Sequence, residues 1–130
     1  KDIHSVLFGT YSFWEGVDVP GDALSHVIIV KLPFGVPSDP VFAARSEAIT
    51  KRGGSSFMEL SVPEAVIKFR QGFGRLMRKS TDKGVVTILD KRLITKRYGS
   101  IFINSIPHTK VCYESISLIC SKIQNLLDTN

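Results

Sequence analysis

The sequence predicts a mixed α/β domain in which a parallel sheet is covered by helices on both faces. Three short apolar runs rich in β-branched residues indicate buried strands: SVLFG at 5–9, HVIIVKL at 26–32 and VVTIL at 85–89. Helical segments are expected between and after these runs. Short apolar strands alternating with helices are typical of three-layer parallel α/β folds.

The first helix is expected directly after a proline-rich stretch. The segment 33–40 (PFGVPSDP) contains three prolines and must be irregular. Ser38 or Asp39 can cap a helix that has Pro40 at its first position and runs to about Lys51. The paired glycines at 53–54 then predict a hinge or a mobile turn.

Three more helices are expected downstream. The stretch SVPE at 61–64 forms a capping box, which starts a helix over 63–78. The segment 98–105 is expected to be helical and to stop before Pro107. A last helix is expected over 113–127, with an apolar face made of Ile116, Ile119, Cys120, Ile123, Leu126 and Leu127.

Composition limits the function only loosely. The 130 residues suit one domain, 1–130, and 43% of them are hydrophobic, enough for a core. Lys and Arg number 17 against 12 Asp and Glu, an excess that fits a nucleic acid or phosphate ligand without requiring one. No signal peptide or membrane span is recognised, so a cytoplasmic location without a membrane partner is expected. The chain begins at Lys1 and soon enters an apolar run, so we expect a piece of a longer protein.

The two cysteines indicate neither a disulfide framework nor a metal site. Cys112 and Cys120 are too few for a zinc centre, and no metal ligands are predicted in this chain. We expect both thiols to pack as small hydrophobic groups.

Polar residues of two kinds interrupt the apolar pattern. The stretch FWEGVDVPG at 13–21 sets two carboxylates and a tryptophan around a glycine, after the first expected strand. Ligands of open α/β sheets bind at the carboxyl ends of strands, so we expect this stretch at such a site. The stretch QGFGRLMR at 71–78 places two glycines late in a helix, at a cost of about 1 kcal/mol each.

The second stretch aligns long polar side chains. Gln71, Arg75 and Arg78 are spaced i, i+4 and i+7 and therefore share one helix face. Arginine suits a phosphate that is gripped in two places. The alternative, an exposed face of solvated arginines, is disfavoured by the paired glycines and the acidic stretch upstream.

These motifs resemble a known family. QGFGRLMR is similar to the Q-x-x-G-R-x-x-R element of superfamily 2 helicases, and FWEGVDVPG resembles their E-G-hydrophobic-D element. The Trp before the Glu, the stretch 32–40 and the D-x-R at 90–92 resemble the DinG-like branch of the XPD-like helicases. The resemblance covers about residues 5–107 and implies the second RecA-like lobe of an ATP-dependent DNA helicase. Asp90 and Arg92 are also expected to form a structural ion pair.

The resemblance implies roles for the motif residues. Arg75 and Arg78 would act as arginine fingers on the γ-phosphate of ATP, and Gln71 would position the phosphate or the attacking water. Four further residues are expected beside the nucleotide: Glu15, Gly16, Asp18 and Gly74. The partners implied are single-stranded or forked DNA and the N-terminal helicase lobe of the same protein.

Essential parts of an ATPase are missing from the chain. It contains no G-x-x-x-x-G-K-[ST] and no D-E-x-H box, so this lobe lacks its own P-loop. By the resemblance, ATP with Mg²⁺ is bound mainly by a first lobe. That lobe often carries an iron–sulfur cluster in this branch, and Cys112 and Cys120 are not its ligands. The isolated chain is therefore expected to be inactive.

Contacts with DNA are expected at two places. Thr10 and Ser12 are implied by the resemblance as donors to DNA phosphates. Lys51, Arg52, Lys68 and Arg70 fit a phosphate track for single-stranded DNA as well as they fit solvated helix faces, and both interpretations stay open. A second function is also kept: a nucleic-acid-binding module that has lost motor activity and is attached to a nuclease or another domain.

Overall fold

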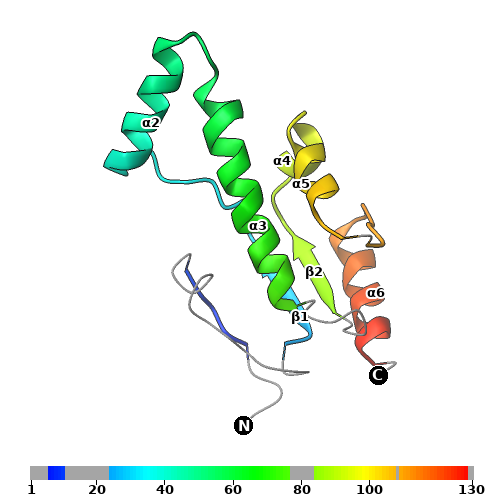
Figure 1. Cartoon of the computed structure of the whole chain (residues 1–130). Helices are drawn as coiled ribbons and strands as arrows, with labels where there is room; N and C mark the ends of the chain where they lie inside the picture. The colour runs from blue at the N-terminus through cyan, green and yellow to red at the C-terminus, as the bar shows by residue number, and fades with distance from the viewer. Residues whose placement is uncertain (1–5, 11–23, 77–83, 108, 129–130) are drawn as a thin grey trace.

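A two-stranded parallel sheet and the helices around it make up the described part of the chain. The computed structural model describes residues 6–10, 24–76, 84–107 and 109–128 (Figure 1). In order, these ranges contain β1 (His26–Ile29), α2 (Pro40–Lys51), the π-helix η2 (Phe57–Ser61), α3 (Val62–Leu76), β2 (Val85–Ile88), α4 (Arg92–Thr95), α5 (Gly99–Ser105) and α6 (Ile116–Asp128). The mixed α/β class with a parallel sheet is confirmed.

The register of the sheet is defined by its ladder. His26 lies opposite Val85 and Ile29 opposite Ile88. The pairing extends past both ends, because the N–H of Val85 donates to the carbonyl of Ser25 at 3.0 Å and that of Leu89 to the carbonyl of Ile29 at 2.9 Å. Parallel strands require a crossover connection, and here α2, η2 and α3 supply it.

Helix α3 runs antiparallel to the strands. At its amino end, the ring of Phe57 stacks on that of Phe34, which follows β1, with 5.7 Å between the centroids. At its carboxyl end lies Gly84, directly before β2, where an added Cβ would come within 2.7 Å of Leu76 Cγ. The carboxyl-terminal turn of α3 therefore lies at the amino edge of the sheet, as Figure 1 also shows.

The core forms between α3, α5 and the ends of the strands. One face of α3 is buried at spacings of three and four residues, through Val62, Ala65, Phe69, Phe73 and Leu76. Phe69 and Phe102 are fully buried, and their rings meet edge to face at 5.5 Å. Phe34 joins them, with its centroid 5.9 Å from that of Phe102. Such aromatic pairs stabilise a core beyond the area they bury.

The predicted start and end of the first helix are confirmed. Helix α2 spans Pro40–Lys51, and Asp39 Oδ1 accepts the N–H groups of Val41 at 2.8 Å and Phe42 at 3.1 Å. The turn after it is also confirmed, because Gly53 adopts φ 83°, a conformation that favours glycine.

The strand predicted at 5–9 is wrong over its described part. Residues 6–10 form no strand, and the Phe8 side chain is 90% exposed. A strand needs a neighbouring strand for its N–H and C=O groups, and neither β1 nor β2 pairs with this segment. An apolar run alone cannot specify that neighbour.

The capping box predicted at 61–64 is also wrong. Ser61 is the last residue of the π-helix η2, which leads directly into α3, so helical structure begins several residues earlier. Ser55 Oγ accepts the N–H of Met58 at 3.3 Å, and Glu59 forms an ion pair with Arg52. Burial of Leu60 draws this turn onto the core, and tertiary packing thereby overrides the local signal.

Helix α6 confirms the predicted helix but not its burial. It spans Ile116–Asp128 and contains no buried residue. Cys112 and Cys120 are both exposed, so the prediction that they pack as hydrophobic groups is wrong. Apolar spacing determines which residues share a helix face, whereas burial depends on what covers that face.

Gly99 allows α5 to begin against α4. A Cβ at this position would overlap the carbonyl oxygen of Leu93, which is backbone and cannot rotate away. We expect Gly99→Ala to lower the free energy of unfolding by about 1–3 kcal/mol, because the added methyl group must push α5 off α4.

The matched control for this change is Gly74→Ala. Among the described atoms, none would lie within 4 Å of a Cβ at Gly74, and alanine is the better helix former by about 1 kcal/mol. Thermal unfolding should therefore show a lower midpoint for Gly99→Ala and an equal or higher one for Gly74→Ala. Equal midpoints for Gly99→Ala and the parent would mean that α5 can shift away from α4 without loss of stability.

Candidate functional site

Helix α3 divides the QGFGRL stretch between two faces. Gly72, Phe73 and Leu76 are buried, whereas Gln71 and Gly74 are exposed. The buried residues anchor the helix to the core, and the exposed ones leave its polar face open. Arg75 belongs to α3, but its side chain lies outside the described part of the structure.

Most of the other predicted site residues lie outside the described part of the chain. Outside the described ranges lie Ser12, Glu15, Gly16, Asp18 and Arg78. Their predicted roles stay predictions. Thr10 is described and exposed, in a segment without helix or strand.

The QGFGRL stretch lies at the opposite edge of the sheet from the one that the rule for α/β ligand sites predicts. Because α3 returns the chain from the carboxyl end of β1 to the amino end of β2, its last turn reaches the amino edge. The approach of Gly84 to Leu76 marks this position. The rule for ligands at carboxyl ends therefore does not describe this element.

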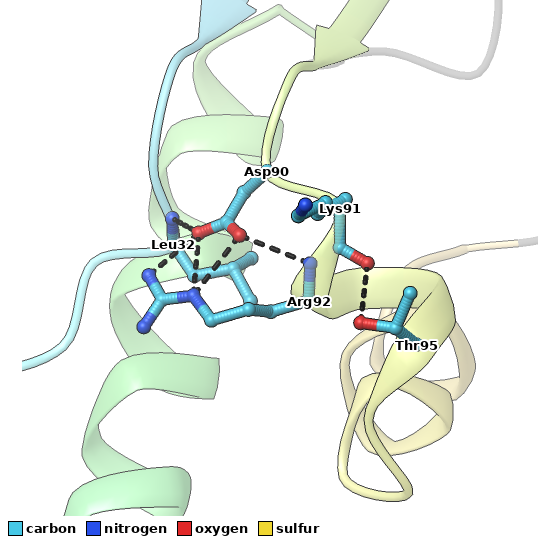
Figure 2. Close-up of polar contacts among 5 residues, drawn as sticks. All are labelled: Leu32, Asp90, Lys91, Arg92 and Thr95. Carbon is cyan, nitrogen blue, oxygen red and sulfur yellow. Dashed lines mark hydrogen bonds and ion pairs between the residues drawn. The ribbon is translucent and has the colours of Figure 1, made fainter.

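The carboxyl edge carries a different polar group, shown in Figure 2. Asp90 follows β2, and its Oδ2 accepts the N–H of Leu32, which follows β1, at 2.9 Å. Arg92 approaches the same carboxylate with Nε at 3.0 Å and a terminal guanidinium nitrogen at 2.6 Å, and its backbone N–H donates to Oδ1 at 3.1 Å. We call these three residues the Asp90 clamp. The ion pair predicted between Asp90 and Arg92 is confirmed.

The electrostatics of the Asp90 clamp favour the charged forms of both Asp90 and Arg92. The Asp90 side chain is only 7% exposed. Hydrogen bonding to the Arg92 guanidinium lowers the pKa of Asp90 far below its usual range, assisted by the N–H groups of Leu32 and Arg92, while burial opposes this shift. The same contact raises the pKa of Arg92. Its guanidinium also lies 5.2 Å from the centroid of the Phe34 ring, a cation–π contact.

The Asp90 clamp is built for structure. Both carboxylate oxygens are occupied by donors, so the group is not available to move a proton. What it does is tie the carboxyl ends of β1 and β2 to each other and to the start of α4.

The basic residues predicted at the end of α2 are ion-paired. Lys51 Nζ lies 2.7 Å from Glu47 Oε1 one turn earlier, and Arg52 contacts Glu59 of η2. All four side chains are well exposed, and exposed pairs of this kind contribute little to stability. Their predicted part in a phosphate track stays a prediction.

A pocket that the sequence analysis missed lies between α4 and α5. Its volume is about 500 Å³, and its lining includes Leu93, Lys96, Arg97, Ser100, Asn104 and Tyr113. We call it the α4–α5 pocket. The absence of Asp and Glu from 91–113 was the available signal, since five Lys and Arg residues fall in that segment.

The described ranges contain neither a membrane-spanning helix nor a cluster of metal-binding side chains. None of the helices in them is long and apolar enough to cross a membrane. The same ranges contain no group of three or more His, Cys, Asp or Glu side chains that could hold a metal ion.

Comparison with known proteins identifies relatives of high similarity. The chain is 54% identical over 109 residues to the ATP-dependent DNA helicase YoaA of Haemophilus influenzae, covering 84% of the chain and 17% of that protein. It is 50% identical over 107 residues to the 3'-5' exonuclease DinG of Bacillus subtilis, covering 82% and 12%. Over 106 residues it is 48% identical to the ATP-dependent helicase DinG of Mycobacterium tuberculosis, covering 82% and 16%.

The match covers most of this chain but only a small part of each relative. The chain spans between 12% and 17% of the length of these three curated proteins. The family model described as the helicase C-terminal domain matches residues 1–109, which include both helicase-like motifs. The resemblance inferred from the motifs is thereby confirmed, and the chain belongs to the helicase C-terminal domain family, with relatives at about 50% identity among the DinG and YoaA proteins.

Proposed function

We propose that the chain is the C-terminal motor lobe of an ATP-dependent DNA helicase, with a RecA-like fold. In the complete protein it faces an N-terminal lobe that binds ATP and Mg²⁺. Arg75 and Arg78 act on the γ-phosphate across the cleft, and Gln71 positions the phosphate or the attacking water. The substrate is single-stranded or forked DNA.

The observation that supports this proposal is the open face of α3. Gln71 and Gly74 are exposed, and no described atom would lie within 4 Å of a Cβ at Gly74, although Phe73 and Leu76 between and beyond them are buried. A helix end that is anchored on one side and open on the other suits a contact with another lobe. Glycine there lets a ligand or backbone approach closely.

The order of the motifs along the chain is consistent with this proposal. The acidic element with Glu15, Gly16 and Asp18 ends shortly before β1, which begins at His26. The amino end of β1 lies at the same edge of the sheet as the last turn of α3. We propose that the carboxylates of this element orient the arginine fingers.

The chemistry asked of this lobe is electrostatic. During phosphoryl transfer, negative charge builds on the γ-phosphate oxygens, and cations fixed beforehand stabilise that charge without reorganising. Arginine grips two phosphate oxygens at once and stays protonated. By the resemblance to the family, magnesium would be held by the first lobe.

The experiment that tests the proposal compares ATP hydrolysis by the full-length protein with that by residues 1–130 alone. We expect single-stranded DNA to stimulate hydrolysis by the full-length protein and the chain alone to show none, because the P-loop is absent from it. Hydrolysis by the chain alone would contradict the proposal.

A second function is favoured by one comparison. The Bacillus subtilis relative is named as a 3'-5' exonuclease, which fits a nucleic-acid-binding lobe that has lost motor activity and serves a nuclease. If the full-length protein binds DNA but hydrolyses no ATP with every motif residue present, this second function takes precedence. Its DNA affinity should then fall with salt, with a slope of about −0.7 per phosphate contacted on single strands.

A further inference from the structure

The net charge of the chain is concentrated in one segment. Residues 91–113 contain five Lys and Arg residues and no Asp or Glu, whereas the rest of the chain contains twelve of each sign. The net charge of +5 is therefore the charge of this segment alone. Clustered positive charges attract a polyanion more strongly than scattered ones do.

The fold presents two of these cations at the α4–α5 pocket. Lys96 and Arg97 stand in the turn between the helices, and both are exposed. Neither forms an ion pair with any residue that the structure describes. Arg92 is different, because the Asp90 clamp already uses its guanidinium.

The turn is held in place by short contacts. The N–H of Gly99 donates to the carbonyl of Lys96 at 2.9 Å, and Ser100 Oγ donates to the carbonyl of Arg97 at 3.0 Å. Gly99 itself has no room for a side chain. The backbone carrying the two cations is thus fixed before any ligand arrives, which reduces the entropy lost on binding.

The pocket also has apolar and hydrogen-bonding parts. Its lining includes Leu93 and Ile103, and the Asn104 amide provides both a donor and an acceptor. Tyr113 lines the same pocket and is 59% exposed. Cations beside an exposed aromatic ring are the combination by which proteins hold a phosphate and stack an unpaired base.

We propose that the α4–α5 pocket binds single-stranded DNA, with Lys96 and Arg97 on backbone phosphates and a base stacked on Tyr113. An unpaired base is required, because a base inside a duplex cannot offer its face to a side chain. The volume of about 500 Å³ lies within the range of small-ligand sites.

The position of the pocket separates it from the proposed nucleotide contacts. Helices α4 and α5 follow the carboxyl end of β2, whereas the QGFGRL stretch lies at the amino edge (Figure 1). DNA and ATP could therefore contact the lobe at the same time. The choice of DNA as the polymer rests on the proposed function, while the pocket itself does not depend on ATP hydrolysis.

The test measures binding of a fluorescent oligo(dT) to the full-length protein by anisotropy, without nucleotide, over a range of salt. We expect Lys96→Ala with Arg97→Ala to weaken binding at least tenfold at low salt and to reduce the salt slope by about 1.4, which corresponds to two phosphate contacts. Tyr113→Ala should weaken binding about 5- to 150-fold, and Tyr113→Phe, which keeps the ring, should not.

The control removes two cations from other surfaces. Arg45→Ala with Lys122→Ala takes the same charge from α2 and α6, where both residues pair with glutamates, and should leave the slope nearly unchanged. All variants should keep the parent's thermal midpoint and its ATPase rate without DNA. An inactive parent would refute the proposed function alone, because the binding comparison does not use ATP.

Two outcomes would overturn the DNA site. Affinity and slope equal to the parent's in the Lys96/Arg97 double variant would show that the pocket does not contact DNA, and an acidic protein segment would become the occupant to test. The second outcome is that the Lys96/Arg97 double variant loses affinity equally for duplex and single-stranded DNA, while Tyr113→Ala loses none. The site would then be a general basic surface without base stacking.

Discussion

Arg78→Ala is expected to lower the DNA-stimulated ATPase rate of the full-length protein by about 10³-fold or more, the range found for arginine fingers in phosphoryl transfer. Arg75→Ala should act in the same direction. ATP binding should persist in both variants, because this chain contains no P-loop and the proposed function assigns the P-loop and the magnesium ligands to the first lobe. The decrease should therefore appear mainly in kcat, with a smaller change in KM.

The physical reason for this effect is the position of the charge. An arginine that touches the γ-phosphate contributes mainly when negative charge develops in the transition state. Arg78→Lys keeps a positive charge but loses the fork that grips two oxygens, so we expect it to recover only a small part of the rate.

The control is Arg70→Ala, assayed at saturating DNA. Arg70 is exposed on α3, one residue before Gln71, and its loss changes the net charge by the same amount. Its rate should stay within about twofold of the parent's, because the resemblance gives it no place at the γ-phosphate. Normal turnover by Arg78→Ala, with the fold intact, would remove Arg78 from the catalytic residues.

Local signals in the sequence predicted local structure well. Helix α2 has the predicted first and last residues because Asp39 caps it with its own side chain and Pro40 preforms its first turn. The strands β1 and β2 were found from their β-branched runs and α6 from its apolar spacing, and α3 and α5 lie within a few residues of their predicted ranges. These features depend on neighbours in the chain, which a sequence displays directly.

Features that depend on distant residues were missed. The run at 5–9 has the composition of a strand, yet Phe8 is exposed because no described strand pairs with that segment. The open face of α6 is a second example. The edge of the sheet at which the QGFGRL stretch lies was not predicted, since it depends on the direction in which α3 crosses the sheet.

The candidate site was predicted as a set of residues without its surroundings. The family motifs identified Gln71 and Arg75, and the helix shows that Gln71 lies on the exposed face. The α4–α5 pocket has no motif and joins α4, α5 and Tyr113, so only the charge count could have pointed to it. The ion pair of Asp90 and Arg92 was predictable from their spacing, whereas its link to Leu32 was not.

That link leads to the largest expected effect on stability. Asp90→Ala should lower the free energy of unfolding by about 3 kcal/mol, near the lower end for loss of one partner of a buried pair. The change leaves the N–H of Leu32 without its acceptor and Arg92 without its counterion. Arg92 is 39% exposed and can recover part of its hydration, which is why the lower end applies.

Two variants distinguish the loss of the Asp90 clamp from the loss of any carboxylate. Asp39→Ala removes an exposed carboxylate that caps α2 and should cost about 1 kcal/mol. Asp90→Ala combined with Arg92→Ala should cost less than the sum of the two single changes, because each single change leaves a partner unpaired. Chemical denaturation measures these differences, and amide exchange at Leu32 reports the local opening.

The contribution of Asp90 should also depend on pH in one direction. Its pKa is lower in the folded state than in the unfolded state, where it is about 4, so the unfolded chain takes up the proton first as pH falls. The stabilisation is therefore complete above pH 4 and declines as pH falls below it. The gap between the parent and Asp90→Ala should be constant from pH 7 to pH 5 and should narrow below pH 4. A gap that stayed constant down to pH 3 would mean that the Asp90 carboxylate is no better stabilised in the fold than in the unfolded chain, and the clamp would then not be what joins β1 to β2.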